Sequence, residues 1–259
     1  MNIYIYIIQV MLIDAHLWKD FFIGGIIGVS QGIVGHPFDT IKVVYQNKSS
    51  LNTMRINSIF GLYRGVRYPI YASFLTNLSL FPIYEKVKRD ILLYNDIKYD
   101  NTNTTYWPSY IAGTMGGLFS TPIVYITDMA KIKKQMDPNY TINYRKLIKN
   151  RGLMLTTYRE SIAYGFYFYT YDKLNHNYNS FFSGGMAGCV TWTITYPIDV
   201  LKTQQMTTNY SIKNCIKLNK NPTDYWRGYI PCLARSFIVN GVSFYIYDNL
   251  KYYLYDSTA

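Results

Sequence analysis

The sequence predicts an all-α membrane protein with six transmembrane helices, in three pseudo-symmetric two-helix repeats around a central cavity. Three observations predict it. Only 16% of the 259 residues are charged, against about a quarter in soluble domains. Three segments share spaced motifs, and each has room for two helices long enough to cross a bilayer. The mean hydropathy of −0.06 then requires the polar residues to face the cavity and the connecting segments.

The first motif links closely spaced glycines to a proline and to an acid and a base three residues apart. Two copies match, and in both the proline follows nine positions after the last glycine: Gly24, Gly28, Pro37, Asp39, Lys42 and Gly184, Gly188, Pro197, Asp199, Lys202. The middle copy is looser, and its proline lies one turn before the expected position: Gly113, Gly117, Pro122, Asp128, Lys131. Small residues on one helix face permit close helix contact.

The second motif is an aromatic residue and an acid followed by a base. The three copies are Tyr84-Glu85 with Lys88, Tyr171-Asp172 with Asn175, and Tyr247-Asp248 with Lys251. In each copy an Arg-Gly pair places its glycine 19 residues before the tyrosine. We therefore expect one domain, residues 1–259, with repeats at about 15–95, 105–176 and 178–256. The predicted helices are Phe21–Tyr45, Pro69–Arg89, Trp107–Gln135, Thr156–Asn175, Phe181–Gln205 and Pro231–Leu254.

The sequence gives little support for an enzyme, a metal-binding protein or a nucleic-acid-binding protein. The three cysteines lack metal-ligand spacing, and no nucleophile–base pair or phosphate-cradling loop occurs. We therefore expect no enzyme, no metal site and no cofactor. The net charge of +11 suits nucleic-acid binding, but the bases stand beside acids at fixed offsets, so no nucleic-acid partner is expected. A soluble helical-repeat scaffold remains the alternative from another class.

The tripled motifs resemble those of the mitochondrial carrier family, from about Trp18 to Tyr255. The resemblance implies a monomeric, multi-pass protein of the mitochondrial inner membrane, with short matrix-side helices, that exchanges a small anionic metabolite by alternating access. The compositional bias is also similar to that of carriers encoded by giant DNA viruses, which would act in the host mitochondrion. Cardiolipin is then expected as a structural lipid near Arg64, Gly65, Arg227 and Gly228.

The resemblance also implies two gates of ion pairs between helices. At the matrix gate it pairs Asp39 with Lys131, Asp128 with Lys202 and Asp199 with Lys42, braced by Gln46 and Gln135. At the cytoplasmic gate we expect Asp172 to pair with Lys251 and Asp248 with Lys88. Glu85 would then face Asn175, and the hydroxyls of Tyr84, Tyr171 and Tyr247 would brace the ring.

The substrate site implied by the resemblance lies midway along the second helix of each repeat. It comprises Arg159, Glu160, Arg235, Thr76 and Asn77. Arginine suits carboxylate or phosphate, and with the basic charge balance this favours nucleotides or deoxynucleotides such as dATP, dTTP or ADP. The Arg159-Glu160 pair instead resembles carriers of amino acids or S-adenosylmethionine, which is the alternative.

Overall fold

The structure is a computed structural model that describes residues 18–38, 63, 66–94, 106–136, 151–219, 221–226 and 228–256. Every regular element in these ranges is helical, which confirms the all-α prediction. A first helix, Trp18–Phe38, precedes α3 (Arg67–Tyr94), α4 (Trp107–Met136), α6 (Leu153–Asn175), α7 (Ser180–Thr208), α8 (Ile212–Leu218), η1 (Pro222–Trp226), α9 (Tyr229–Lys251) and the π-helical η2 (Tyr252–Asp256).

Six long helices thus occur in the described ranges, one for each predicted span. The predicted end of the first helix, at Tyr45, lies outside these ranges. By length and mean hydropathy, one described helix, Trp18–Phe38 with a value of 1.3, is apolar enough to cross a membrane unaided. The others carry more polar residues, as the low mean hydropathy of the chain requires.

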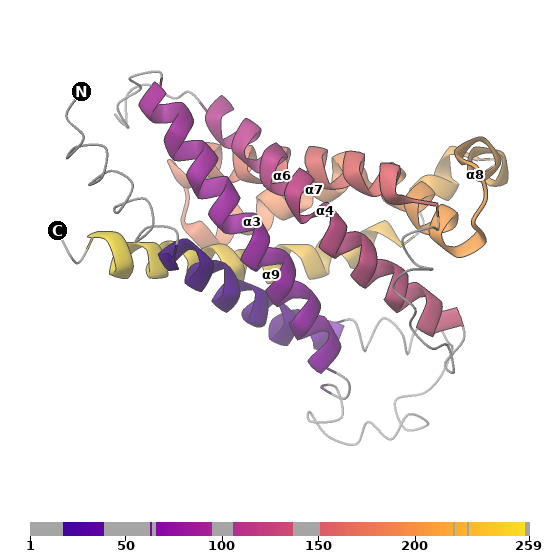
Figure 1. Ribbon diagram of the computed structural model, residues 1–259, viewed down its shortest axis with the longest axis horizontal. Coiled ribbons are helices and arrows are strands. Elements are labelled where there is room, and N and C mark those ends of the chain that lie inside the picture. Colours follow the sequence, from indigo (N-terminus) through magenta and orange to yellow (C-terminus); the bar gives the residue numbers. More distant parts are fainter. Residues whose placement is uncertain are drawn as a thin grey trace, which may run out of the picture.

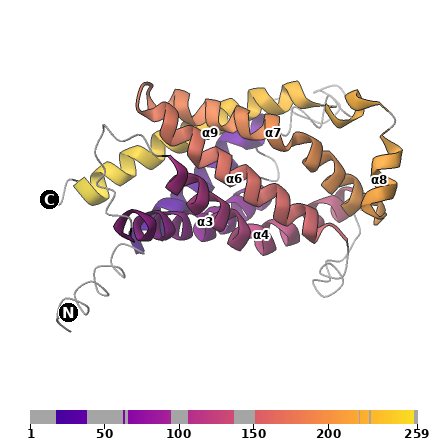
Figure 2. The same cartoon turned by 90° about the horizontal axis from the view of Figure 1, so that it is seen from above.

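The long helices pack on one another in chain order and form a ring. The helices α3, α4, α6, α7 and α9 each pack on the next along the chain. The first helix closes the ring, because its glycines lie against α3 and its Gly35 lies against the Arg235 guanidinium of α9. Figures 1 and 2 show the short α8 at one end of the bundle and η2, which follows α9, at the other. The six helices therefore surround one common axis.

Within the ring, glycines bring three pairs of helices into backbone contact. A side chain at any of these glycines would strike the backbone carbonyl of the following long helix. The contacts fall seven residues before the motif tyrosine in every case: Gly24 on Asn77, Gly113 on Tyr164 and Gly184 on Asn240. The Gly-x-x-x-Gly stripes therefore have the role in helix packing that the sequence predicts.

Glycine also sets the start of two long helices. Gly152 precedes α6 with φ 117° and Gly228 precedes α9 with φ 80°. Both angles lie in the left-handed region, which glycine adopts without steric cost. Turn chemistry therefore explains the glycine of these two Arg-Gly pairs. The first pair, Arg64-Gly65, and Arg227 lie outside the described residues.

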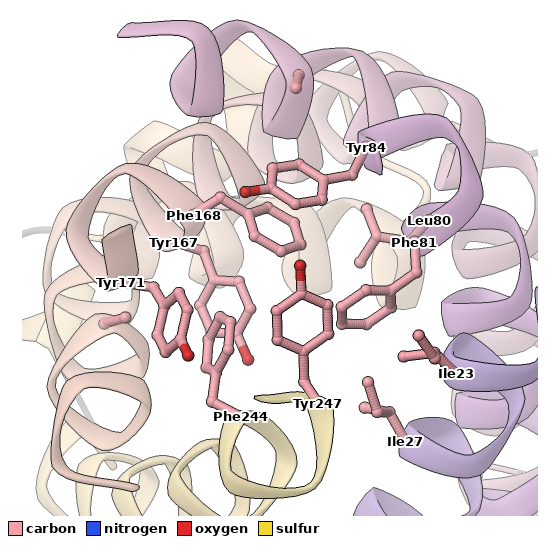
Figure 3. Packing of buried hydrophobic residues seen from close by; sticks show 12 residues of the cluster. Ile23, Ile27, Leu80, Phe81, Tyr84, Tyr167, Phe168, Tyr171, Phe244 and Tyr247 are labelled. Atoms are coloured by element: carbon pink, nitrogen blue, oxygen red, sulfur yellow. The ribbon is translucent and has the colours of Figure 1, made fainter. Parts of the chain in front are cut away.

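An aromatic core fills the bundle at the end where the motif tyrosines lie (Figure 3). We call it the aromatic plug. Each of the six long helices contributes at least one buried residue to it: Ile23, Ile27, Leu80, Phe81, Tyr84, Ala112, Tyr167, Phe168, Tyr171, Ala187, Phe244 and Tyr247. Tyr84 stacks on Phe168 with ring centroids 3.6 Å apart, and Tyr171 stacks on Phe244 at 3.4 Å. The bundle is therefore sealed at this end.

Candidate functional site

A charged cluster surrounds two consecutive residues of α6, Arg159 and Glu160. The Nη1 atom of Arg159 donates to both carboxylate oxygens of Glu160, at 2.8 Å each. Lys202 of α7 lies between two carboxylates, because its Nζ is 3.3 Å from Glu160 Oε1 and 2.7 Å from Oδ2 of Asp128 in α4. Glu160 is only 1% exposed. Its charge is therefore compensated by both bases rather than by water.

Two more side chains of α7 complete this cluster. The Nε atom of Arg159 is 3.5 Å from Oδ1 of Asp199. Its guanidinium carbon lies 4.8 Å from the ring centre of Trp192, a cation–π distance. We call the set Asp128, Arg159, Glu160, Trp192, Asp199 and Lys202 the arginine cluster. Arg159, a predicted substrate residue, links α6 to α7, and Lys202, a predicted gate residue, links α7 to α4 and α6.

The other predicted substrate residues lie on α3 and α9. Thr76 and Asn77 are both buried. The hydroxyl of Thr76 donates to the carbonyl of Ala72, and the amide of Asn77 donates to Gln31 Oε1 of the first helix at 2.9 Å. Arg235 of α9 extends to Gly35 of the first helix. The structure thus brings Arg159 and Glu160 into direct contact, whereas Asn77 and Arg235 each reach the first helix.

A second polar assembly, the tyrosine network, borders the aromatic plug. It consists of the three second-motif copies: Tyr84, Glu85, Lys88, Tyr171, Asp172, Asn175, Tyr247, Asp248 and Lys251. Lys88 Nζ lies 2.5 Å from Asp172 Oδ2 and 2.9 Å from the Tyr84 hydroxyl. Lys251 Nζ lies 2.8 Å from Glu85 Oε1 and 3.0 Å from the Tyr247 hydroxyl. A third contact, 3.2 Å long, joins Asn175 Nδ2 to Asp248 Oδ2.

Comparison with known proteins agrees with this arrangement. The sequence profile described as "Mitochondrial carrier protein" matches residues 14–95 and 174–258, which is more than half of the chain. The chain belongs to the mitochondrial carrier protein family. It is therefore a solute transporter and a multi-pass protein of the mitochondrial inner membrane, as the sequence motifs predict, and its family consists of transporters rather than enzymes.

Curated members of the mitochondrial carrier family resemble this chain over most of its length. It is 27% identical to the mitochondrial arginine transporter BAC2 of Arabidopsis thaliana, over 89% of both chains. It is 26% identical to the human mitochondrial basic amino acids transporter, over 87% of each. A mitochondrial magnesium exporter of Drosophila melanogaster is 27% identical, over 85% of this chain and 89% of that one.

The predicted pairing at the cytoplasmic gate was wrong, because the residues of the tyrosine network have other partners. Asp172 pairs with Lys88 rather than Lys251, Glu85 pairs with Lys251, and Asp248 faces Asn175. Both charged pairs thus run around the ring in the sense opposite to the prediction. Positions three residues apart on a helix point about 60° apart, so each acid and each base faces a different neighbour. Spacing along the chain does not say which neighbour lies on which side.

The predicted matrix gate of the carrier is described only in part. The contact of Asp128 with Lys202 is confirmed at 2.7 Å. Asp199 contacts Arg159, a partner that was not predicted. Asp39, Lys42 and Gln46, with the side chains of Lys131 and Gln135, lie outside the described part of the chain.

Sequence reasoning missed several polar residues of the carrier. The hydroxyl of Ser109 donates to Asp172, and that of Ser180 donates to Asp248. In the first helix the corresponding residue is Asp20, 1% exposed, which accepts from Arg89 at 2.8 Å and from Tyr255 at 2.6 Å. All three lie four residues before the first motif glycine, a spacing that would have found them. Trp192 had no such signal.

Proposed function

We propose that this carrier exchanges a small zwitterionic solute with a cationic side group, a basic amino acid such as arginine, by alternating access. The observation that supports the proposal is the internal pairing of Arg159 with Glu160 in the arginine cluster. A buried acid and base that already compensate each other can exchange partners with a zwitterion without leaving a charge uncompensated. Arg159 then receives the carboxylate of the solute and Glu160 receives its cationic group.

The charge of the arginine cluster favours a cationic group over a polyanion. Its described residues comprise three carboxylates, from Asp128, Glu160 and Asp199, and two bases, Arg159 and Lys202, so the sum is −1. A nucleotide would bring several negative charges beside Glu160, a carboxylate that is 1% exposed. Uncompensated charge in a buried site is costly. The Trp192 ring adds a face that attracts a guanidinium or an ammonium group.

Lys202 supplies the proposed coupling between substrate and gate. Its ammonium is shared by Glu160, at 3.3 Å, and Asp128, at 2.7 Å. A cationic substrate at Glu160 competes with Lys202 for that carboxylate. Occupancy of the site therefore alters the contacts of a gate lysine, and a binding site with such differential contacts shifts the balance between two conformations.

The wider proposal is a pseudo-threefold bundle with two gates. The six long helices are the six spans, the three repeats have the predicted limits, and the short α8 is a matrix-side helix. The tyrosine network and the aromatic plug form the cytoplasmic gate, and Asp128 with Lys202 belongs to the matrix gate. The equal offsets at which Gly24, Gly113 and Gly184 meet the following helix support the repeats. We propose a monomer with cardiolipin beside the helix start at Gly228.

Nucleotides are the second candidate substrate. The predicted substrate-site arginines, Arg159 and Arg235, and the net charge of +11 favour an anion. S-adenosylmethionine also fits, because it combines an amino-acid zwitterion with a sulfonium cation. The deciding experiment is exchange into proteoliposomes of labelled arginine, dATP and S-adenosylmethionine. We expect arginine exchange that is lost in Arg159→Ala and retained in Lys173→Ala, which removes an exposed base from the same helix. Exchange of dATP alone would overturn the proposal.

A further inference from the structure

The tyrosine network has three corners that share one design, and one corner lacks a component. At the first corner the ammonium of Lys88 contacts the Asp172 carboxylate and the Tyr84 hydroxyl. At the second the ammonium of Lys251 contacts the Glu85 carboxylate and the Tyr247 hydroxyl. At the third corner the position of the lysine is occupied by Asn175. The acid and the tyrosine are present there, and the ammonium is absent.

In the part of the chain that the structure describes, the acid and the tyrosine of the third corner have no cationic partner. Asp248 receives hydrogen bonds from Asn175 and Ser180, and no base among the described residues forms an ion pair with it. The hydroxyl of Tyr171, in a residue that is only 3% exposed, lies beside the Asp248 carboxylate and the Ser180 hydroxyl. The equivalent tyrosines, Tyr84 and Tyr247, each accept a hydrogen bond from a lysine ammonium, and Tyr171 has no such donor within the described ranges.

The third corner also has open space beside it. A cavity of about 440 Å³ is lined by Tyr171, Asn175 and Asp248 together with residues of the other two corners. A second, shallow pocket that is open to the surface is lined by Asn175, Ser180 and Asp248. The carboxylate of Asp248 therefore borders both pockets, and the first is large enough to admit a small organic cation.

We propose that the third corner binds a primary ammonium group in place of the missing lysine. An ammonium has three donors and no acceptor. The Asp248 carboxylate, the Tyr171 hydroxyl and the side-chain oxygen of Asn175 supply acceptors for it. The other corners show the same chemistry, with a lysine ammonium between an acid and a tyrosine hydroxyl. Bound there, the ammonium completes the ring of the tyrosine network and stabilises the state in which that end is closed.

The ammonium has two possible sources. One is a soluble amine, which under the proposed function includes the transported amino acid, and in that respect the inference rests on the proposed function. The other is the headgroup of phosphatidylethanolamine. Both present the same chemistry to Asp248, so the experiment needs one arm for each.

The test measures thermal unfolding of the purified full-length carrier. In detergent, n-butylammonium chloride is compared with tetramethylammonium chloride, which has no N–H donor, at equal ionic strength. At about five times its dissociation constant, the primary amine is expected to raise the unfolding midpoint by roughly 2–4 °C. In vesicles, adding phosphatidylethanolamine to phosphatidylcholine is the second arm. The proposal requires a rise in at least one arm that Asp248→Asn abolishes; equal responses to both salts and both lipids would overturn it.

Two variants make the test independent of any loss of folding. Asn175→Lys supplies the missing ammonium within the chain, so its midpoint should be raised and no longer respond to the amine. Lys88→Asn recreates the third corner at Asp172, where Ser109 takes the place of Ser180, and should gain an amine response. An amine response that persists in Asn175→Lys would contradict the proposal. Because no transport is measured, a carrier that fails to exchange arginine still tests this site.

Discussion

Replacing Glu160 with glutamine separates the two candidate substrates by the sign of the effect. Glutamine keeps the shape and one acceptor oxygen, so Arg159 retains a partner and the fold should survive. What is lost is the negative charge of a side chain that is 1% exposed and contacts two bases. A hydrogen bond to a charged group contributes about 1.5–3 kcal/mol. If the solute cation makes one such bond, kcat/KM for arginine should fall about 10- to 150-fold.

The assay is the initial rate of labelled arginine exchange by proteoliposomes loaded with arginine. Asp90→Asn, which neutralises an exposed acid on α3, is the matched control and should leave the rate unchanged. Thermal unfolding of both variants checks that they are folded. For an anionic substrate the removal of a neighbouring negative charge is favourable. A Glu160→Gln carrier that exchanges dATP faster, and arginine no more slowly, would therefore refute the reasoning.

Three further perturbations test the bundle itself. Phe168→Ala removes a fully buried ring of the aromatic plug, at a cost of about 3–5 kcal/mol in the free energy of unfolding. We expect a lower unfolding midpoint and efflux of solute from proteoliposomes in the absence of counter-solute. Proteoliposomes that retain their solute would contradict a sealing role for the aromatic plug. Gly152→Ala forces a side chain into φ 117° and should cost about 1–2 kcal/mol, which calorimetry can measure; an unchanged midpoint would show that the backbone relaxes. Asp20→Asn removes the charge that holds Arg89 and Tyr255, and faster hydrogen exchange across residues 252–256 is expected, whereas unchanged protection would assign that anchoring to apolar packing.

The positions of the motif charges along each helix could be predicted from the sequence, because the motif spacings repeat. The contact of Asp128 with Lys202, which the family resemblance implies, is present. The partners within the tyrosine network could not be predicted, since spacing along a helix defines a direction relative to that helix alone. The partners follow from the ring of helices, in which Lys88 of α3 contacts Asp172 of α6 and Glu85 of α3 contacts Lys251 of α9.

The arginine cluster shows a second limit of sequence reasoning. Arg159 and Glu160 were predicted as substrate residues, and the basic composition then favoured an anion. Net charge averages over the whole chain, whereas recognition depends on a few side chains within hydrogen-bond distance. Only the folded arrangement shows that Asp199 and Trp192 converge on Arg159 from another helix. Trp192 has no aromatic counterpart at the same offset in the other repeats, where Gly32 and Thr121 stand.

The glycine contacts determine which parts of the bundle can move relative to one another. Where Gly24, Gly113 and Gly184 touch the next helix, the backbones leave no room for a side chain. Sliding within such a pair would require both backbones to separate. Ion pairs join the helices of different pairs, as Lys88 joins Asp172, Lys202 joins Asp128 and Lys251 joins Glu85, and such contacts can exchange partners. Conformational change should therefore proceed as rocking of three stiff hairpins, and cross-links within a hairpin should leave exchange intact while cross-links between hairpins arrest it.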